Sequence, residues 1–475
     1  MRPDKKMAHR LDRLQTHLKR ENPELVSVVD RYRDLDKVAQ KIGLIKPGES
    51  YATQISWWPL ISVLGTFSAG KSSFINSYLG LDLQETGNQA VDDRFTVVAY
   101  SADKEVRTLP GLALDSDPRF PFYKISDEIE GVNEGEGAKI DNYLQMKAAP
   151  SEKIRGKILI DSPGFDADEQ RKSILKITDH IIDLSDLVLV LFDARHPEPG
   201  AMQDTLEHLV RGAQRRNDSS KFLFILNQID SSARDDNLEQ IVSAWQKALI
   251  QTGLVSGRFY VMFNKDLAVP VEDKYVWNRY LSKRDTDFAK ITQRMEAVNT
   301  DRVYRIIGAV ESLLNQIEQQ AVPQIIQAKQ LWRKRVIWLD ILVATLLLGS
   351  ILFTAYSFEL WSLTTLPSLD VLLIAGIVFI VALKLFHFFI KGKIAKYIAN
   401  SLNEEEPYGN VRQAFLKSTG LFRSVFFDKP AGWRRGTKNK INAIRHDIEV
   451  FVQDLNDRFT SPAGENSRSG KKEEK

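Results

Sequence analysis

The stretch Gly65-Thr-Phe-Ser-Ala-Gly-Lys-Ser72 decides the fold, because its spacing is that of a phosphate-binding loop. It follows an apolar run, Trp58 to Leu64, and precedes a helix-like segment, Phe74 to Leu79. In such a loop the glycines let backbone N–H groups surround the phosphates, the lysine reaches the β and γ oxygens, and the last hydroxyl binds Mg²⁺. The alternative, a plain glycine turn, rarely has a strand before it and a helix after it. The stretch therefore predicts an α/β P-loop domain with a mostly parallel sheet that binds a nucleoside triphosphate.

A second acidic element is expected near the metal, and Lys157-Ile-Leu-Ile-Asp-Ser-Pro-Gly164 has the form of a buried strand ending in Asp-x-x-Gly. Asp161 would hold Mg²⁺ through a water, and the Gly164 N–H would contact the γ-phosphate. Asp-Ser-Pro-Gly is also ordinary turn chemistry, but its place downstream of a phosphate loop favours the first interpretation. The predicted metal ligands are therefore Ser72 and Asp161.

Two further apolar runs, Leu187 to Phe192 and Lys221 to Leu226, predict buried strands, and the second leads directly into Asn227-Gln-Ile-Asp230. A carboxylate at Asp230 can accept hydrogen bonds from the N1–H and the 2-amino group of guanine, whereas adenine offers no such pair of donors. Asn227 would brace the neighbouring loops. Gln228 stands where such motifs usually have a lysine, which bears on nucleotide affinity and not on the base. The sequence predicts GTP, the alternative being a polar loop after a strand.

These motifs resemble those of the dynamin superfamily, including its EHD, mitofusin and bacterial dynamin-like branches, over about half the chain. Gly65-x-x-Ser68-x-Gly-Lys-Ser-Ser73 is similar to the dynamin-type phosphate loop, and Asp92-Asp-Arg-Phe-Thr-Val-Val98 to the segment after the first switch. Leu191-Phe-Asp-Ala194 resembles the EHD form of that strand, and Phe263-Asn-Lys265 the motif at the edge of the base. The resemblance implies a GTPase that dimerises across its nucleotide face, with slow basal turnover.

The motifs identify the catalytic residues less directly than the binding residues. In the resembled family the first switch offers a threonine to Mg²⁺ and the catalytic water, and the matching positions here are Val91 and Asp92. Thr96 is the nearest hydroxyl, or Thr86 if the loop folds differently. Phe67 stands where some members have a catalytic glutamine, so the transition state would depend on backbone groups, lysine, Mg²⁺ and a serine. The predicted catalytic residues are Lys71, Ser68 and Thr96; the predicted nucleotide contacts are Gly65, Ser68, Ala69, Gly70, Lys71, Ser72, Ser73, Asp161, Gly164, Asn227, Gln228, Asp230, Asn264 and Lys265.

Two hydrophobic runs follow the nucleotide motifs. Ile341 to Phe358 holds no side chain that is charged at pH 7, and Val371 to Ile390 is interrupted only by Lys384 and His387 near one end. At about 1.5 Å per residue, a helix of that length almost crosses a ~30 Å hydrocarbon layer. With the short connection Glu359 to Ser368 they predict a two-span transmembrane hairpin. The alternatives are a helix pair buried in a soluble core and a hairpin that enters one leaflet.

Charge sets the expected orientation. Lysines and arginines precede the first run and follow the second, whereas the connection contains neither. Both termini and the GTPase domain should therefore face the cytosol, at the inner membrane if the cell is bacterial. Trp332, Trp338 and Trp361 fall near the ends of the runs, where indole rings settle at the headgroup level.

Composition narrows the remaining choices. The chain has 475 residues, 43% of them hydrophobic and 27% charged, with a net charge of +3 that gives no reason to expect nucleic acid. It contains no cysteine, which excludes disulfides, cysteine nucleophiles and cysteine-ligated metal sites. The first residues lack the apolar core of a cleavable signal peptide.

Three segments outside the nucleotide domain have helical periodicity, beginning at Leu25, Val303 and Ile441, and Pro323 is expected to kink or end the second. Their apolar stripes would bury one another in a helical bundle, or belong to separate packing helices. Gly420 to Arg435 mixes basic and aromatic residues, which suits contact with lipid headgroups or a structured loop. The expected organisation is an N-terminal helical segment (1–55), a dynamin-type GTPase domain (56–290), a helical neck or stalk (291–335), the transmembrane hairpin (336–390), a C-terminal helical segment (391–460) and a disordered tail (461–475).

Together these features predict a membrane-anchored, dynamin-like GTPase that uses GTP with Mg²⁺ and forms homodimers or larger homo-oligomers. Its expected partners are GTP, GDP and the lipid bilayer, and its expected work is membrane fusion, fission or tethering. The competing interpretation is a membrane-tethered switch whose GTP state recruits a partner without mechanical work. A subunit of an ATP-dependent transporter is disfavoured, because Asp230 suits guanine and two spans alone make no pathway.

Overall fold

The structure is a computed structural model. It describes residues 5–65, 68–85, 94–115, 120, 122, 125–130, 135, 137–163, 171–195, 219–251, 257–268, 271–357, 369–404, 406–420 and 422–460. The chain divides into two compact units. The nucleotide unit comprises Asp12–Val26 and Thr53–Ile306, and the helical unit comprises Met1–Leu11, Ser27–Ala52 and Ile307–Lys475.

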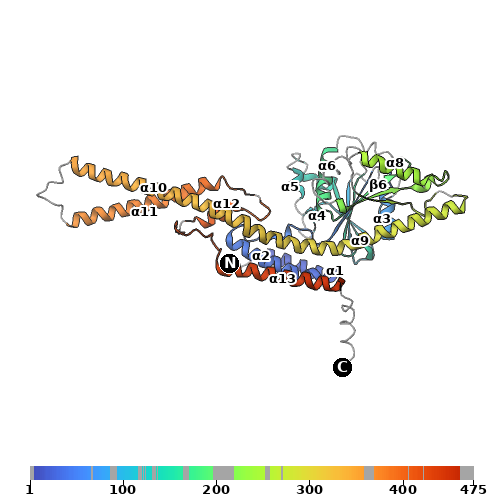
Figure 1. The fold of residues 1–475 in the computed structure, drawn as a ribbon, viewed down its shortest axis with the longest axis horizontal. Helices are drawn as coiled ribbons and strands as arrows, with labels where there is room; N and C mark the ends of the chain where they lie inside the picture. The colour runs from blue at the N-terminus through green and yellow to red at the C-terminus, as the bar shows by residue number, and fades with distance from the viewer. Residues whose placement is uncertain are drawn as a thin grey trace, which may run out of the picture. The chain divides into compact units, whose positions relative to one another are not determined.

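The nucleotide unit is built on an eight-stranded sheet in the order β3-β4-β2-β5-β1-β6-β7-β8 (Figure 1). Its strands are β1 (Leu60–Gly65), β2 (Phe95–Tyr100), β3 (Arg107–Pro110), β4 (Leu144–Ala149), β5 (Ile158–Asp161), β6 (Leu187–Asp193), β7 (Phe222–Asn227) and β8 (Arg258–Val261). Only the β2–β5 and β3–β4 pairings are antiparallel, and the other five are parallel. The expected mostly parallel sheet is confirmed.

The central strands are mostly apolar because helices cover both faces of the sheet. Alternate residues of β6 enter different cores: Val188 and Val190 pack in a cluster with Trp245, whereas Leu189 and Leu191 pack with Phe74. The helices and helical turns of this unit are η1 (Pro23–Leu25), α3 (Lys71–Leu79), α4 (Leu112–Asp115), α5 (Ile125–Glu130), η3 (Gly137–Asn142), η4 (Glu152–Ile154), α6 (Arg171–Leu184), η5 (Ser219–Lys221), η6 (Ile229–Ser232) and α8 (Leu238–Gln251). Three helices, α1 (Lys5–Glu21), α2 (Val26–Ile42) and α9 (Lys274–Gln316), have residues in both units, as does the turn η2 (Tyr51–Thr53).

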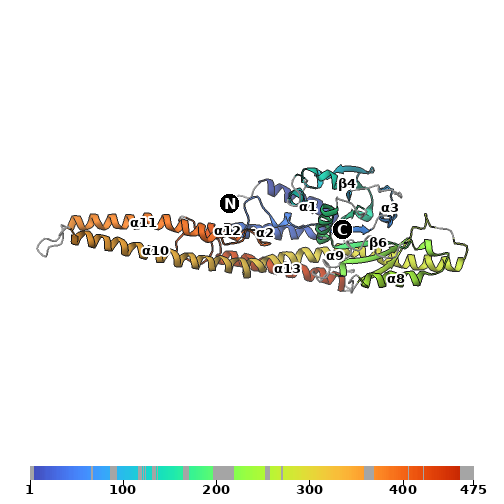
Figure 2. The same cartoon turned by 90° about the horizontal axis from the view of Figure 1, so that it is seen from above.

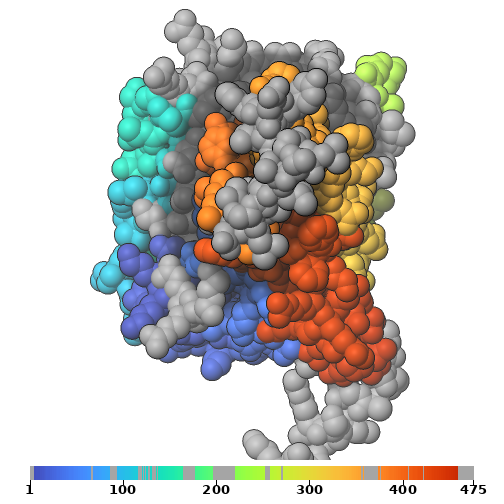
Figure 3. Space-filling model, turned by 90° about the vertical axis from the view of Figure 1, so that its left-hand side faces the viewer, coloured from blue at the N-terminus to red at the C-terminus, as the bar shows by residue number. Residues whose placement is uncertain are grey.

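The helical unit brings together segments far apart in sequence. α2 (Val26–Ile42) buries the predicted stripe that includes Tyr32 and Leu35, and α13 (Arg435–Thr460) buries Ile441 and Ile444. Arg31 on α2 pairs with Asp447 on α13, and a second pair between these helices joins Lys440 Nζ to Asp34 Oδ1 at 3.0 Å. Figure 3 shows the blue surface of α2 adjoining the red surface of α13. The expected helices from the two ends of the chain therefore pack together.

Of the two outcomes expected at Pro323, a kink or an end of the helix, the end does not occur. α9 passes through the π-turn η7 (Ile317–Ala321) into α10 (Val322–Ser357), where the Val322 N–H donates to the Ile317 carbonyl five residues earlier. A π-turn changes the hydrogen-bond register by one residue, and it lets the helix continue past a proline that has no N–H to donate. Helical residues run continuously from Lys274 to Thr354.

The apolar part of α10 lies along α11 (Leu369–Ala399), and the two helices run antiparallel in Figures 1 and 2. The Trp332 indole donates to the Lys391 carbonyl at 2.9 Å, and His387 Nδ1 lies 2.7 Å from Asp340 Oδ2. Among the described residues, one helix, Lys274–Thr354, is long and apolar enough to cross a membrane, and little of its most apolar window is buried. The second predicted span is a helix, but its connection to the first falls in residues 358–368, outside the described part of the chain.

A last short helix, α12 (Val411–Ser418), packs against both α10 and α11. The Asn410 side chain caps it by accepting from the Gln413 N–H at 2.6 Å. Phe415 on α12 is fully buried in a cluster with Trp332 and Ile398. The expected disordered tail, residues 461–475, lies outside the described residues.

Candidate nucleotide-binding site

The phosphate loop connects the end of β1 to the start of α3. Gly70 caps the helix with a φ of +81°, and Ser68 has a φ of +60°. A Cβ built on Gly70 would lie 2.3 Å from Asn227 Nδ2, so only glycine permits this approach. Thr66 and Phe67 lie outside the described residues. The predicted Ser72 and Ser73 fall in the first turn of α3, where unpaired backbone N–H groups favour phosphate.

Lys71 lies inside the loop. Its Nζ donates to the Gly65 carbonyl at 3.1 Å, and the side chain is buried. Burial lowers the pKa of Lys71, whereas the negative charge of nearby Asp161 acts in the opposite direction. A buried ammonium inside such a loop is suited to binding phosphate oxygens, whose negative charge favours its protonated form.

The guanine-type motif braces the phosphate loop directly. Asn227 Nδ2 donates to the Ala69 carbonyl at 2.9 Å, and Gln228 Nε2 donates to the Ser68 carbonyl at 2.5 Å. Gln228 itself has a φ of +62°, which turns the chain sharply after β7. Asn227 therefore has the bracing contact expected of it. Gln228, at the position usual for a lysine, also uses its side chain to hold the loop.

Asp230 lies on η6, two residues after Gln228, with 8% of its surface exposed. The Ile229 N–H donates to the Met262 carbonyl at 3.3 Å, which joins this turn to the end of β8. Because β5, β1, β6, β7 and β8 are parallel neighbours, their carboxyl ends meet at one edge of the sheet. The structure thus brings the phosphate loop, Asp161 and Asp230 to that edge, where α/β sheets bind ligands.

The sequence motifs did not identify an arginine near Asp230. Arg195 forms a bidentate pair with Asp193 at the end of β6, with Nη2 2.6 Å from Oδ2 and Nε 3.0 Å from Oδ1. These hydrogen bonds raise the pKa of Arg195, burial lowers it, and the charges of Asp193 and Asp230 raise it further. The only signal in the sequence was the position of Arg195 immediately after the segment Leu191-Phe-Asp-Ala194.

The base-edge segment lies just beyond β8. Asn264 Oδ1 accepts from the Asp266 N–H at 3.0 Å, and Lys265 Nζ lies 2.8 Å from Asp285 Oδ1 on α9. The hydrogen bond from Lys265, followed by that from Arg284, lowers the pKa of Asp285. Asn264 and Lys265 therefore lie at the same end of the sheet as Asp230, with the lysine bound to α9.

A buried polar network that no sequence motif indicates holds Asp161. Gln84 Nε2 donates to Asp161 Oδ2 at 2.7 Å, while Gln84 Oε1 accepts from Lys147 Nζ at 2.6 Å. Asn76 on α3 fixes this turn, since its Oδ1 accepts from the N–H groups of Leu83 and Gln84 at 3.0 and 2.9 Å. Residues from four separate segments thus set the position of the predicted metal carboxylate.

Thr96 is a fully buried residue of β2, in register with Asp161 on the antiparallel neighbour β5. Its hydroxyl accepts from Gln145 Nε2 at 2.8 Å. The side chain is therefore engaged within the sheet, and a catalytic role for it stays a prediction. Thr86, Val91, Asp92 and Gly164, the other positions considered for the switches, lie outside the described residues.

The donor set suits Mg²⁺ bound with phosphates. No cluster of three histidine, aspartate or glutamate side chains occurs among the residues that the structure describes. Mg²⁺ in a nucleotide site is held by one or two protein oxygens together with phosphates and waters. Ser72, next to Lys71, and Asp161, whose charge acts on Lys71, fit that requirement.

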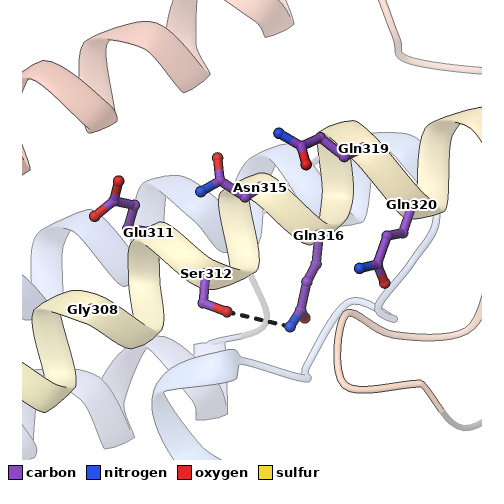
Figure 4. A pocket seen from close by; sticks show the side chains of 7 residues that line it. All are labelled: Gly308, Glu311, Ser312, Asn315, Gln316, Gln319 and Gln320. Atoms are coloured by element: carbon purple, nitrogen blue, oxygen red, sulfur yellow. Dashed lines mark hydrogen bonds between the residues drawn. The ribbon is translucent and has the colours of Figure 1, made fainter.

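One open pocket of about 440 Å³ lies in the helical unit (Figure 4). All its lining residues come from α9 and η7, and Gln316 Nε2 donates to Ser312 Oγ at 3.3 Å. The lining contains Glu311 and amide side chains but no lysine or arginine. It has none of the chemistry that a triphosphate requires.

Comparisons with known proteins agree with this geometry. EH domain-containing protein 2 of Arabidopsis thaliana is 26% identical over 179 residues, and EH domain-containing protein 1 of Homo sapiens is 24% identical over the same length. The matches cover 36% of this chain in both cases, and 30% and 31% of the relatives, so the chain spans less than a third of their length.

Two solved structures are also similar. One is an oligomerised bacterial dynamin pair, described as providing a mechanism for long-range sensing and tethering of membranes. The two sequences are 14% identical, the match covers 98% of this chain and 77% of that chain, and the TM-score is 0.33. The other is a point variant of Era from Aquifex aeolicus bound to GDP and tetrafluoroaluminate. The two sequences are 13% identical, the match covers 47% of this chain and 56% of that chain, and the TM-score is 0.26. These scores are too low to establish a shared arrangement. The dynamin family profile, however, matches residues 61–229, from the first strand to the guanine-type motif. Residues 61–229 therefore form part of a dynamin-type GTPase domain.

Proposed function

We propose that this protein binds GTP with Mg²⁺ and hydrolyses it. The observation that carries the proposal is the contact of two side chains with the phosphate loop. Asn227 and Gln228, which lie three and two residues before Asp230, donate hydrogen bonds to loop carbonyls. This bracing links the loop that would hold the phosphates to the turn that would recognise the base. A carboxylate at Asp230 would accept from both donors of guanine, which adenine lacks.

In this proposal the chain's own residues bind and orient the nucleotide. Lys71 would exchange the Gly65 carbonyl for the β and γ oxygens, and Ser72 and Asp161 would hold the metal, which would neutralise charge on the phosphates. Ser68 and the N–H groups of the loop stabilise charge in the transition state, and Gly164 senses the γ-phosphate. With a phenylalanine at 67, we expect slow basal turnover that rises when two nucleotide faces pair.

We also propose that α10 and α11 form a membrane hairpin with both ends on the cytosolic side. Large apolar side chains on both helices are exposed, including Leu346 and Phe353 on α10 and Ile377 on α11. Exposed apolar area of this extent indicates contact with lipid or with a partner. The basic residues that precede α10's apolar run and follow α11's favour a cytosolic base. The six domain limits given from the sequence remain part of this proposal.

GTP hydrolysis would be coupled to membrane remodelling if GTP binding pairs copies of the nucleotide domain while the hairpin anchors each copy in lipid. Hydrolysis would then release the switch contacts and drive membrane fusion, fission or tethering. The alternative function is a membrane-tethered switch that recruits a partner in its GTP state. The two differ in one measurable respect, because only the first deforms or joins membranes in the absence of other proteins.

Reconstitution into liposomes tests both parts together. GTP turnover and vesicle shape are measured with GTP, GDP and a non-hydrolysable analogue, and GTP competes against ATP for the purified protein. Lys71→Ala should abolish nucleotide binding. Asp230→Asn should transfer preference from guanine to xanthine, because the amide donates where the carboxylate accepted. An unchanged base preference in Asp230→Asn would show that the guanine contact is assigned to the wrong residue.

A further inference from the structure

The segment between α12 and α13 carries three phenylalanines that the fold leaves exposed. Phe422 is 95% exposed, Phe426 76% and Phe427 72%. Exposed apolar residues are ordinary when scattered singly, but three large rings within six positions form a patch. We call residues 422–429 the aromatic loop.

The aromatic loop is held in place by two buried lysines. Lys329 on α10 donates from Nζ to the Phe427 carbonyl at 2.6 Å, and Lys391 on α11 donates to the Arg423 carbonyl at 3.1 Å. Val425 points inward and is buried in the cluster around Trp332. The contacts therefore fix the backbone and one aliphatic side chain, and they leave the neighbouring rings outside.

The loop lies where the apolar stretches of both helices end. Lys391 directly follows Ile390, the last residue of the second apolar run. On α10, Arg333 pairs with Asp428 of the loop at 2.7 Å, three residues before Val336. At 1.5 Å per residue this ion pair lies about 5 Å along the helix from Val336, the first residue of the predicted transmembrane segment, within the depth of a headgroup layer.

The charges around the loop have one sign. Apart from Asp428, which pairs with Arg333, the charged side chains exposed on the nearby turns of α10 and α11 and in the loop are basic. The exposed basic residues are Lys334, Arg335, Lys393, Lys396, Arg423 and Lys429. A basic surface next to exposed aromatic rings is complementary to an anionic lipid leaflet, where rings enter the interface and cations meet headgroups.

We infer that the aromatic loop is a second lipid-binding surface, separate from the hairpin: its three phenylalanines insert into the cytosolic leaflet and the surrounding basic side chains bind anionic headgroups. The inference depends on the proposed membrane hairpin, because that hairpin brings the loop to the bilayer. A surface of this kind on one side only would fix the depth of the hairpin and hold its base against the leaflet.

The absence of cysteine from the chain makes a direct test practical. Three single-cysteine variants of the full chain, each labelled with an environment-sensitive fluorophore, are reconstituted into phosphatidylcholine vesicles with or without phosphatidylglycerol. Phe426→Cys reports the loop, Leu348→Cys reports the exposed apolar face of α10, and Asp454→Cys reports an exposed position on α13. Lipids brominated at shallow or deep positions quench the label according to its depth.

We expect shallow bromines to quench the label at 426 several-fold more than the label at 454, and phosphatidylglycerol to increase the difference. The label at 348 should be quenched by deep bromines in either lipid. Quenching at 348 with none at 426 would overturn the lipid-binding loop and leave the hairpin standing. Loss of quenching at 348 would instead overturn the hairpin. Shielding of 426 in detergent without quenching by lipid would mean that protein covers the loop, which also contradicts the inference.

Variants separate the two forces. Replacing Phe422, Phe426 and Phe427 together by serine should reduce shallow quenching of a label placed at 424 several-fold. Because these rings are exposed, the variant should fold, and its GTP turnover in detergent should equal that of the parent. Arg423→Glu with Lys429→Glu should remove the effect of phosphatidylglycerol. The matched control is Val450→Ser, an exposed apolar residue on α13, which should change neither result.

Discussion

Asp186 joins the long helix α9 to the sheet, and its replacement by alanine should weaken the nucleotide unit. Its carboxylate accepts from Arg302 Nη1 at 3.1 Å, from Arg305 Nη1 at 3.0 Å and from the Leu60 N–H at 2.9 Å. The Asp186 side chain is completely buried, while those of Arg302 and Arg305 are 13% and 38% exposed. One carboxylate therefore connects the starts of β1 and β6 to two turns of α9.

The magnitude follows from what each partner can do without the carboxylate. Removing one member of a buried ion pair costs about 3–5 kcal/mol. Arg305 can turn to water, and Arg302 keeps its hydrogen bond from Nε to the Ser56 carbonyl at 2.7 Å. The loss should therefore lie at the lower end, about 3 kcal/mol for Asp186→Ala. Asp186→Asn should cost less, because its amide oxygen still accepts from the Leu60 N–H.

Hydrogen–deuterium exchange is the suitable measurement, since a chain of two units need not unfold in one step. A loss of about 3 kcal/mol should accelerate exchange in peptides from β1 and β6 on the order of 100-fold. The matched control is Asp103→Ala, which breaks a 3.3 Å pair with Arg107 whose side chains are 56% and 63% exposed. Such a pair is worth at most about 1 kcal/mol. Equal exchange in β1 and β6 for the two variants would refute the role assigned to Asp186.

Three further predictions concern single sites. Gly70→Ala should weaken binding of a fluorescent GTP analogue roughly tenfold or more without unfolding the protein, since a left-handed φ costs a side chain ~1–2 kcal/mol and the new Cβ would displace Asn227. Trp332→Phe should lower the unfolding free energy of the helical unit by about 1 kcal/mol through its lost hydrogen bond to Lys391, and Trp332→Ala by ~3–5 kcal/mol, read from exchange in α11. Burial raises the pKa of Asp36 from 3.8 to about 6, although Ser50 and the Tyr51 N–H oppose the shift. The folded state therefore binds the extra proton between these values, and the stability due to Asp36 falls as pH rises through that window, by roughly 3 kcal/mol in total. Exchange in α2 should show Asp36→Asn gaining on the parent by up to that amount between pH 4 and pH 7, and a constant difference would contradict the shift.

The parts of the site that sequence could predict are those whose chemistry is local. Gly65 to Ser72 contains every group that a phosphate loop needs at fixed spacing, and the apolar run before Asn227 marks a buried strand without further context. The order of such segments was enough to predict a mostly parallel sheet. It was not enough to predict the antiparallel pairing of β2 with β5, which places Thr96 beside Asp161 inside the sheet.

The parts that the sequence could not predict depend on contacts between residues that are far apart in the chain. Gln84 and Lys147 belong to no motif, and their roles exist only because the fold brings both of them to Asp161. The same holds for Lys329 and Lys391, which read as flanking charges of two apolar runs but are buried beneath the aromatic loop. Pro323 does not end the helix, because the π-turn before it shifts the hydrogen-bond register by one residue.

Gln228 shows how a departure from a motif can be local in sequence and distributed in structure. A lysine at this position would add a positive charge beside the base, and glutamine cannot. Its amide nevertheless holds the Ser68 carbonyl, so the bracing of the phosphate loop does not require the charge. Positive charge near Asp230 comes instead from Arg195, whose guanidinium is fixed by two oxygens of Asp193. If a base binds at Asp230 as proposed, we expect Arg195 to supply the positive charge near it, while Gln228 keeps its hydrogen bond to the phosphate loop.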